Sequence, residues 1–238
     1  MALPIINVPK YEITVPSTGK KIKVRPFLIK EQKILLIAQE SEDLDVMINS
    51  IKEIITSCTD GAVDVETLAM FDLEYIILQI RAKSVGEVVE LLFKCEDCVD
   101  NEKAVVQINI DLTTIQIEHN PEHNKKILLF NDVGVVMKYP SFSLFKKLDE
   151  TTENDYIGYI NLIQECIELV YDSDDVYPFK DQSAESIESF IGDLTTEQFD
   201  KIKKFFDTTP KLRKEVEYKC PVCNKEHKKT LEGIKSFF

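Results

Sequence analysis

Two pairs of cysteines constrain the fold of this chain more than any other feature. Cys95 and Cys98 stand in KCEDC, and Cys220 and Cys223 stand in KCPVC. Within each pair two residues separate the cysteines, and 121 residues separate the two pairs. A fold that uses both pairs together must bring distant segments of the chain to one point.

The two pairs predict one structural zinc site. Structural Zn²⁺ prefers four soft ligands in a tetrahedron, and a CxxC turn lets two sulfurs reach the same ion. Typical motifs place about 15–20 residues between the pairs. Closing the longer loop costs roughly 4 kcal/mol beyond a constant, whereas structural zinc contributes on the order of 10–16 kcal/mol. We therefore expect Cys95, Cys98, Cys220 and Cys223 to bind one Zn²⁺, with no position open for water or substrate.

Other uses of these cysteines stay open at this point. Disulfides are not expected in a reducing compartment. A redox dithiol normally opens a helix in a βαβ unit, whereas both pairs here lie between predicted strands. Iron–sulfur ligation and two unrelated surface pairs are further alternatives. His227 follows Cys223 by four residues and could replace a cysteine as ligand.

The first third of the chain predicts a hairpin and a helical bundle. Residues 8–25 alternate apolar and polar side chains around Ser17-Thr18-Gly19, which is typical of a β-hairpin. Apolar residues at helical spacing then predict three helices between residues 27 and 83. We assign an N-terminal β-hairpin to residues 1–26 and a small helical bundle to residues 27–84.

Strand patterns flank both cysteine pairs. VVELLFK precedes the first pair and AVVQINIDL follows it, while LRKEVEYK and NKEHKKTLEGI flank the second. Each pair is therefore expected at the tip of a β-hairpin, and residues 85–112 and 211–238 together would form a zinc ribbon. Residues 113–210 would be an insertion of hairpin and acidic helices.

Within the insertion, IQIEH predicts a strand, and KKILLFNDVGVVMKYP predicts a hairpin whose turn carries Gly134. Helices are expected at about 141–149 and 154–171, and Thr195 with Gln198 has the form of a capping box for a last helix. The predicted class is α+β: a small helical bundle and β-hairpins, a four-cysteine ribbon built from two distant hairpins, and an α/β insertion between them.

The net charge of −13 is unevenly distributed. Residues 149–200 hold 15 Asp and Glu against one Lys, while residues 201–238 hold 11 Lys and Arg against 5 Asp and Glu. An acidic chain is poorly suited to phosphate binding. The alternative function is a zinc-ribbon nucleic-acid-binding or transcription-associated module that uses the lysines near the second cysteine pair. These lysines, beside which stacking aromatics are missing, are Lys219, Lys225, Lys228 and Lys229.

No other constellation predicts chemistry. His119 and His123 lack a third metal ligand placed by the sequence, and the acidic run YDSDDVYP lacks the glycine and distal glutamate of a calcium loop. Phosphate-binding loops and nucleophile motifs are absent from the sequence, so neither an enzyme nor a small-molecule substrate is expected. The start MALPIINVPK lacks the features of a signal peptide and no apolar run approaches a membrane span, which predicts an intracellular protein without a membrane partner.

Three longer stretches resemble a known family. These are YEITVPSTGKKIKVRPFLIKEQKILLIAQES, FDLEYIILQIRAKSVGEVVELLFKCEDC and HNKKILLFNDVGVVMKYPSF. Over roughly the first 145 residues the chain resembles the T4-like bacteriophage baseplate hub and hub-assembly family. The resemblance leaves out residues 149–200 and the second cysteine pair.

The resemblance implies a structural or assembly component of a contractile-tail baseplate hub. Such a protein would be made in the host cytoplasm and would bind other phage baseplate and tail proteins. The family has no catalytic residues to transfer to this chain. Whether the protein stays in the virion as part of the tail baseplate or leaves as an assembly factor does not follow from the resemblance.

Overall fold

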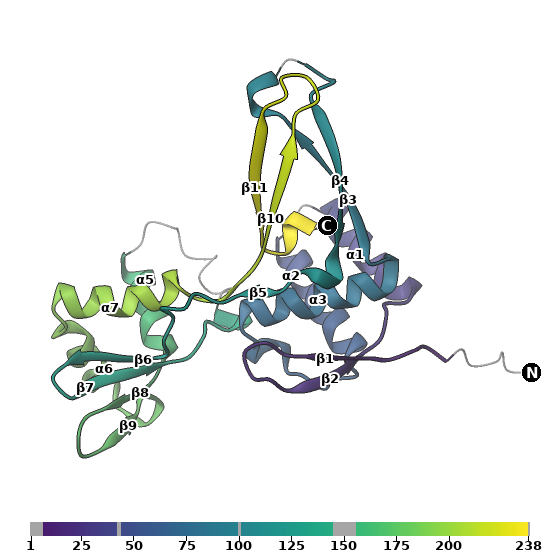
Figure 1. Ribbon diagram of the computed structural model, residues 1–238. Helices are drawn as coiled ribbons and strands as arrows, with labels where there is room; N and C mark the ends of the chain where they lie inside the picture. The colour runs from purple at the N-terminus through teal and green to yellow at the C-terminus, as the bar shows by residue number, and fades with distance from the viewer. Residues whose placement is uncertain (1–6, 42–43, 100, 145–155, 238) are drawn as a thin grey trace, which may run out of the picture. The chain divides into compact units, whose positions relative to one another are not determined.

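The computed structural model describes residues 7–41, 44–99, 101–144 and 156–237 (Figure 1). Helices and small antiparallel sheets occupy separate stretches of this part of the chain, so the class is α+β, as the sequence predicts. The chain divides into two compact units, which we describe separately. Unit 1 is Met1–Glu118 with Lys211–Phe238, and unit 2 is His119–Pro210. Among the described residues, no helix combines the length and apolar character needed to cross a membrane.

Unit 1 begins with the predicted hairpin. Strands β1 (Tyr11–Thr14) and β2 (Lys21–Val24) pair antiparallel, and Gly19 in the turn has a φ of 68°. The turn is fixed to a helix because the backbone N–H of Ser17 donates to the buried carboxylate of Asp72 at 2.8 Å. This bond satisfies a turn amide that the hairpin itself leaves unpaired.

Three helices follow the hairpin, as the apolar spacing predicts: α1 (Ile29–Ser41), α2 (Leu44–Cys58) and α3 (Met70–Val85). A 3₁₀ turn, η1 (Val65–Thr67), precedes α3. Helix α3 is the central element, with buried residues on every side rather than one stripe. In α2, Ile54, Ile55 and Cys58 are buried.

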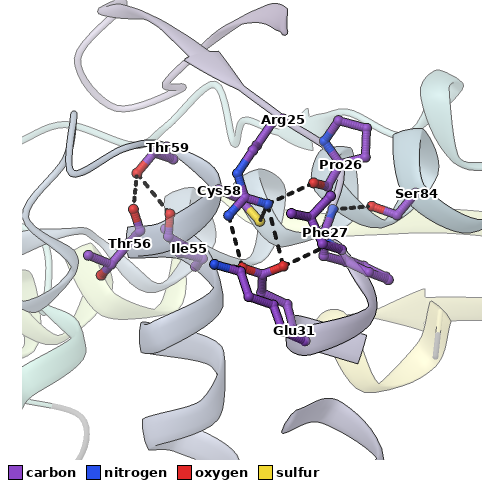
Figure 2. Close-up of polar contacts among 11 residues, drawn as sticks. Arg25, Pro26, Phe27, Glu31, Ile55, Thr56, Cys58, Thr59 and Ser84 are labelled. Carbon is purple, nitrogen blue, oxygen red and sulfur yellow. Dashed lines mark hydrogen bonds and ion pairs between the residues drawn. The ribbon is translucent and has the colours of Figure 1, made fainter. Parts of the chain in front are cut away.

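A buried ion pair joins the hairpin to the helices (Figure 2). Arg25 Nη2 donates to Glu31 Oε1 at 2.9 Å, and the second carboxylate oxygen of Glu31 accepts the N–H of Leu28 at 2.7 Å. The backbone N–H of Arg25 donates to the carbonyl of Cys58 at 2.9 Å. Burial alone would raise the pKa of Glu31, but the guanidinium and the Leu28 N–H stabilise the carboxylate and lower it. The network therefore ties β2 to the start of α1 and the end of α2.

Two long hairpins complete unit 1, and together we call them the arm. The strands of the arm are β3 (Val88–Lys94), β4 (Val105–Asp111), β10 (Lys211–Lys219) and β11 (Glu226–Glu232). β3 pairs with β4, and β10 pairs with β11 and with the short β5 (Ile117–Glu118). The teal and yellow hairpins lie side by side in Figure 1, with their tips together. Short 3₁₀ segments adjoin the strands: η2 (Glu96–Cys98), η3 (Leu112–Thr114) and η5 (Ile234–Phe237).

Unit 2 is a four-stranded antiparallel sheet with helices packed on one face. The strands run in the order β6 (Lys126–Phe130), β7 (Val133–Met137), β8 (Ile167–Tyr171) and β9 (Val176–Pro178). The helices are α5 (Tyr156–Cys166), α6 (Ala184–Gly192) and α7 (Thr196–Asp207), with η4 (Phe179–Asp181) after β9. Their shared core contains Leu129, Met137, Ile163 and Phe205. The predicted capping box of Thr195 and Gln198 is present at the start of α7.

Two sequence predictions in unit 2 are wrong. The helix predicted at 154–171 ends at Cys166, and residues 167–171 form β8, because this β-branched and aromatic stretch pairs with β7 on one side and β9 on the other. Gly134 is not in the turn of the β6–β7 hairpin. Asn131 and Asp132 form that turn, with a φ of 47° at Asn131. The predicted helix at 141–149 lies mostly outside the described residues.

Gly134 has a packing role in β7 instead. The Tyr171 ring from the neighbouring strand and the carbonyl oxygen of Ile127 occupy the space that a side chain at position 134 would need. Glycine is therefore required here for close approach within the sheet.

Candidate metal centre

The first cysteine pair occupies the tip of the β3–β4 hairpin. Cys95 directly follows β3, and its N–H donates to the carbonyl of Ala104 at 2.9 Å, which closes the strand ladder. The chain then turns through η2, so that the N–H of Cys98 donates to the carbonyl of Cys95 at 3.3 Å. This tight turn places both sulfurs on the same side of the hairpin tip.

The second pair forms a matching turn between β10 and β11. The N–H of Cys220 donates to the carbonyl of Lys225 at 2.9 Å, and the N–H of Asn224 donates to the carbonyl of Cys220 at 3.0 Å. Asn224 adopts a left-handed φ of 59°, a conformation that asparagine tolerates better than most residues. The N–H of Val222 points at the sulfur of Cys220 at 3.4 Å. A backbone amide of this turn therefore faces a sulfur.

The structure brings all four predicted cysteines together, and we call them the cysteine cluster. The sulfurs of Cys95, Cys98, Cys220 and Cys223 lie within 4.8 Å of one another. The sulfurs of Cys95 and Cys223 are 3.8 Å apart, and none of the four cysteines is in a disulfide. Cys95 and Cys220 are buried, Cys98 is half-buried and Cys223 is exposed. Four sulfurs at these separations could hold one tetrahedral cation.

The protonation of the cluster is uneven. Donation from the backbone N–H groups of Cys223 and Val222 lowers the pKa of Cys220 to about 7. Burial, together with the sulfurs of Cys223 and Cys95, raises the pKa of Cys98 to about 12. Thiolates crowded together repel one another, and the raised pKa values of Cys95 and Cys98 mean that these two thiols keep their protons at neutral pH. A cation among the sulfurs would reverse this preference.

Aromatic stacking beside the cluster holds the two hairpins of the arm together. The rings of Phe93 and Tyr218 are 5.3 Å apart, and the ring of Tyr218 is 5.1 Å from that of His227. The hydroxyl of Tyr218 donates to the carbonyl of Lys94 at 3.4 Å. The Phe93–Tyr218 contact joins β3 to β10 two residues before the first cysteine of each pair, and it aligns the two hairpin tips.

His227 and Asp97 also lie beside the cluster. His227 Nε2 is 3.2 Å from the sulfur of Cys95, and Cys95, Asp97 and His227 form a second close group of potential ligands. Sequence spacing identified His227 as an alternative ligand but did not single out Asp97. The place of Asp97 inside the KCEDC turn could have indicated it, because its carboxylate faces Lys225 and His227 of the other hairpin.

Two of the four lysines near the second pair are engaged with acidic residues of the arm. Lys225 pairs with Asp97 at 2.8 Å, and Lys228 pairs with Glu215 at 2.7 Å. The ammonium group of Lys229 lies 6.0 Å from the centre of the Phe93 ring. Lysines paired in this way offer a weakened field for phosphate groups.

The remaining candidate residues have structural partners in unit 2. His123 Nδ1 is 3.0 Å from the hydroxyl of Thr208 and its Nε2 is 3.1 Å from the hydroxyl of Tyr139. Asp172 accepts the N–H groups of Asp174 and Asp175 at 2.9 and 2.8 Å. The acidic run is therefore the turn of the β8–β9 hairpin. In the described ranges, the two groups of clustered metal-ligating side chains both lie at the tip of the arm.

Fold and site define an α+β protein in which two hairpins, distant in sequence, meet at a cysteine cluster. The chain belongs to the T4 bacteriophage base plate protein family, whose model matches residues 8–238. It is 25% identical over 230 residues to the baseplate hub assembly protein gp26 of Enterobacteria phage T4, across 96% of this chain and 98% of that protein. No solved structure matches the chain. The match extends the resemblance seen in the sequence across residues 149–200 and the second cysteine pair, so the limit near residue 145 was too short.

Proposed function

We propose that the chain is a structural or assembly component of a contractile-tail phage baseplate hub and that it acts through protein–protein contacts. The main support for this proposal is that the chain belongs to the base plate family over residues 8–238. The relative in phage T4, which is matched over almost its full length, is a baseplate hub assembly protein. The partners in this proposal are other baseplate and tail proteins made in the same infected cell.

The proposal includes one structural Zn²⁺ bound by the cysteine cluster. A tetrahedron with Zn–S bonds of about 2.3 Å places its sulfurs roughly 3.8 Å apart. The separation between the sulfurs of Cys95 and Cys223 is 3.8 Å, which supports this donor set. Because all four ligands would be protein sulfur, the ion would join the two hairpins of the arm and would carry out no chemistry.

Metal analysis tests the zinc proposal. Chain purified without chelator should contain about one equivalent of zinc by elemental mass spectrometry, and Cys98→Ser and Cys223→Ser should lower that value. Cys166→Ala is the matched control, since Cys166 is buried in the core of unit 2 and is not a member of the cluster. Protein with no zinc, or with equal zinc in the cluster and control variants, would contradict the proposal.

Co-purification from infected cells tests the assembly role. A tagged chain should capture baseplate or tail proteins, and their identity would be read by mass spectrometry. Purified particles then separate the two forms of the proposal, because an assembly factor would be missing from the particle and a hub component would remain. A chain that captures no tail protein at any stage of infection would exclude both forms.

The alternative, a zinc-ribbon nucleic-acid-binding module, makes a different prediction. It requires salt-sensitive binding of DNA or RNA that is lost when Lys225, Lys228 and Lys229 become Glu. The ion pairs of Lys225 and Lys228 within the arm favour the protein-contact proposal. In a gel-shift experiment at low salt, binding that the three substitutions remove would favour the nucleic-acid module, and no shift would exclude it.

A further inference from the structure

His227 contacts the first cysteine pair, although it follows the second pair in the sequence. Its Nε2 is 3.2 Å from the sulfur of Cys95, and its side chain is 14% exposed. The two groups of potential metal ligands share Cys95, but His227 belongs only to the group that contains Asp97. The imidazole therefore lies beside the four-sulfur group at one sulfur, and it comes from the opposite hairpin of the arm.

Neighbouring aromatic rings fix the orientation of the His227 ring. It stacks on Tyr218, its cross-strand partner, with 5.1 Å between the ring centres and 19° between the ring planes. The Tyr218 ring stacks in turn on Phe93 of the other hairpin, with 5.3 Å between their centres. Because the imidazole is already held in place, its contact with Cys95 requires little further loss of side-chain freedom.

Two possible acceptors lie near Nε2 of His227, and the distances favour the sulfur. Oδ2 of Asp97 is 3.8 Å away, which is too long for a hydrogen bond. The same oxygen is 2.8 Å from the ammonium group of Lys225, so the carboxylate already has a cationic partner. The sulfur of Cys95, at 3.2 Å, is close enough for an N–H···S bond. A zinc-bound sulfur has no proton, so in the loaded site the ring nitrogen must be the donor.

Comparison of the two hairpins separates packing from hydrogen bonding at this position. In each hairpin the N–H of the first cysteine donates to a carbonyl of the returning chain, that of Ala104 in one and that of Lys225 in the other. Two residues after these carbonyls stand Val106 and His227, each opposite an aromatic residue of the preceding strand. Valine shows that an apolar side chain meets the packing requirement there. His227 differs by adding an N–H group close to a sulfur of the cluster.

We propose that His227 is a positioning residue of the zinc site, whose Nε2–H donates a hydrogen bond to the zinc-bound sulfur of Cys95. This role rests on the zinc proposal, since the sulfur is a permanent acceptor only when it is bound to the ion. Four thiolates around one Zn²⁺ carry net negative charge, and an N–H donor stabilises that charge. Cys220 receives such a bond from Val222 of its own turn, whereas Cys95 receives one from the opposite hairpin. The bond therefore stabilises the ligand and joins the two hairpins at the same point.

Cobalt substitution of the full chain tests this role, because the spectrum of Co²⁺ depends on both the ligand set and the charge on the sulfurs. His227→Phe keeps a ring that can stack but lacks the N–H. It should lower the affinity for Co²⁺ and Zn²⁺ about tenfold, the lower end for loss of such a partner. It should also shift the sulfur-to-cobalt charge-transfer band to lower energy, because the hydrogen bond stabilises the sulfur lone pairs. His227→Gln keeps an N–H donor of similar reach, so both values should stay near those of the unaltered chain.

The visible bands of Co²⁺ show whether four sulfurs are still assembled around the ion in each variant. If His227→Phe leaves both the affinity and the charge-transfer band unchanged, this role is wrong while the zinc site stands. Equal losses in the Phe and Gln variants would assign the effect to ring stacking or to direct ligation, and would also overturn it. If His227→Phe fails to fold, His227→Gln still decides, because a donor role requires normal affinity there. If the unaltered chain gives no four-sulfur cobalt spectrum, the zinc proposal and the role of His227 both fail.

Discussion

Replacing Glu31 with alanine should destabilise unit 1 by about 3 kcal/mol, the lower end of the range for breaking a buried ion pair. The Arg25 side chain is 11% exposed and that of Glu31 is 2% exposed, so neither charge is compensated by water. Without Glu31 the guanidinium stays buried with the carbonyl of Pro26 as a remaining acceptor, and the N–H of Leu28 loses its partner. The remaining bond to Pro26 is the reason for choosing the lower value.

Native-state hydrogen exchange, followed by mass spectrometry, can measure this loss of stability within unit 1. A loss of about 3 kcal/mol corresponds to exchange roughly 100-fold faster in peptides from β2 and α3. Glu12→Ala is the control on the same hairpin, since Glu12 pairs with Lys21 in an exposed position and its removal should change exchange little. An increase below about fivefold for Glu31→Ala would refute the reasoning.

The double variant Arg25→Leu with Glu31→Leu separates the charge effect from packing. It leaves no unpaired charge, so it should be less destabilised than Glu31→Ala alone. A double variant at least as unstable as the sum of the single variants would show that packing, not charge, dominates. The pH dependence has a definite sign, because the folded-state pKa of Glu31 is lowered from 4.5. Its stabilisation is present above the unfolded value and is lost as the pH falls through the lower folded value.

Three further predictions concern unit 2. Gly134→Ala should destabilise the sheet by about 1–3 kcal/mol, because the new methyl group meets the Tyr171 ring and the Ile127 carbonyl. Gly192→Ala is the control, since its methyl group meets no atom within 4 Å. Thermal unfolding of the two variants should therefore show the larger loss of stability for Gly134→Ala. Thr195→Ala should cost about 1 kcal/mol in urea unfolding, since it removes the capping box of α7, and an unchanged midpoint would contradict this. Burial lowers the pKa of His123, so unit 2 should lose stability as the pH falls below the unfolded value near 6.5, and His123→Gln should lack that dependence in melts from pH 7 to pH 5.

The hairpins and the cysteine cluster were predictable because local patterns specify them. Alternating side chains define the strands on each side of KCEDC and KCPVC, and turn geometry places the sulfurs of each pair together. The convergence of the two tips followed from ligand chemistry, since two cysteines leave a tetrahedral site half complete. Asp97 escaped notice because its position relative to His227 depends on how the hairpins pack, which spacing does not encode.

Residues 167–171 were mispredicted because a short apolar run fits both a helix and a strand. The isoleucines at 157, 160, 163 and 167 keep a helical spacing, and the pattern continues through Val170. The structure ends the helix at Cys166 because the next five residues complete the centre of a four-stranded sheet. Gly134 was assigned to the turn for a related reason, because a glycine between two strand patterns is typical of a turn. Its actual role depends on the close approach of the Tyr171 ring, which is a tertiary contact that the local sequence does not encode.

One face of the unit 2 sheet depends on information that the sequence does not contain. Leu128, Val136 and Leu169 each read as ordinary strand residues, and only the register of β6, β7 and β8 places them on one surface. Two strands slipped by one residue would move these apolar side chains into the core and expose Val135 and Val170 instead. The core of unit 2 requires the observed register, because Leu129, Val135 and Ile167 are buried against the helices. The packing that stabilises the unit therefore also determines which apolar side chains lie on the other face of the sheet.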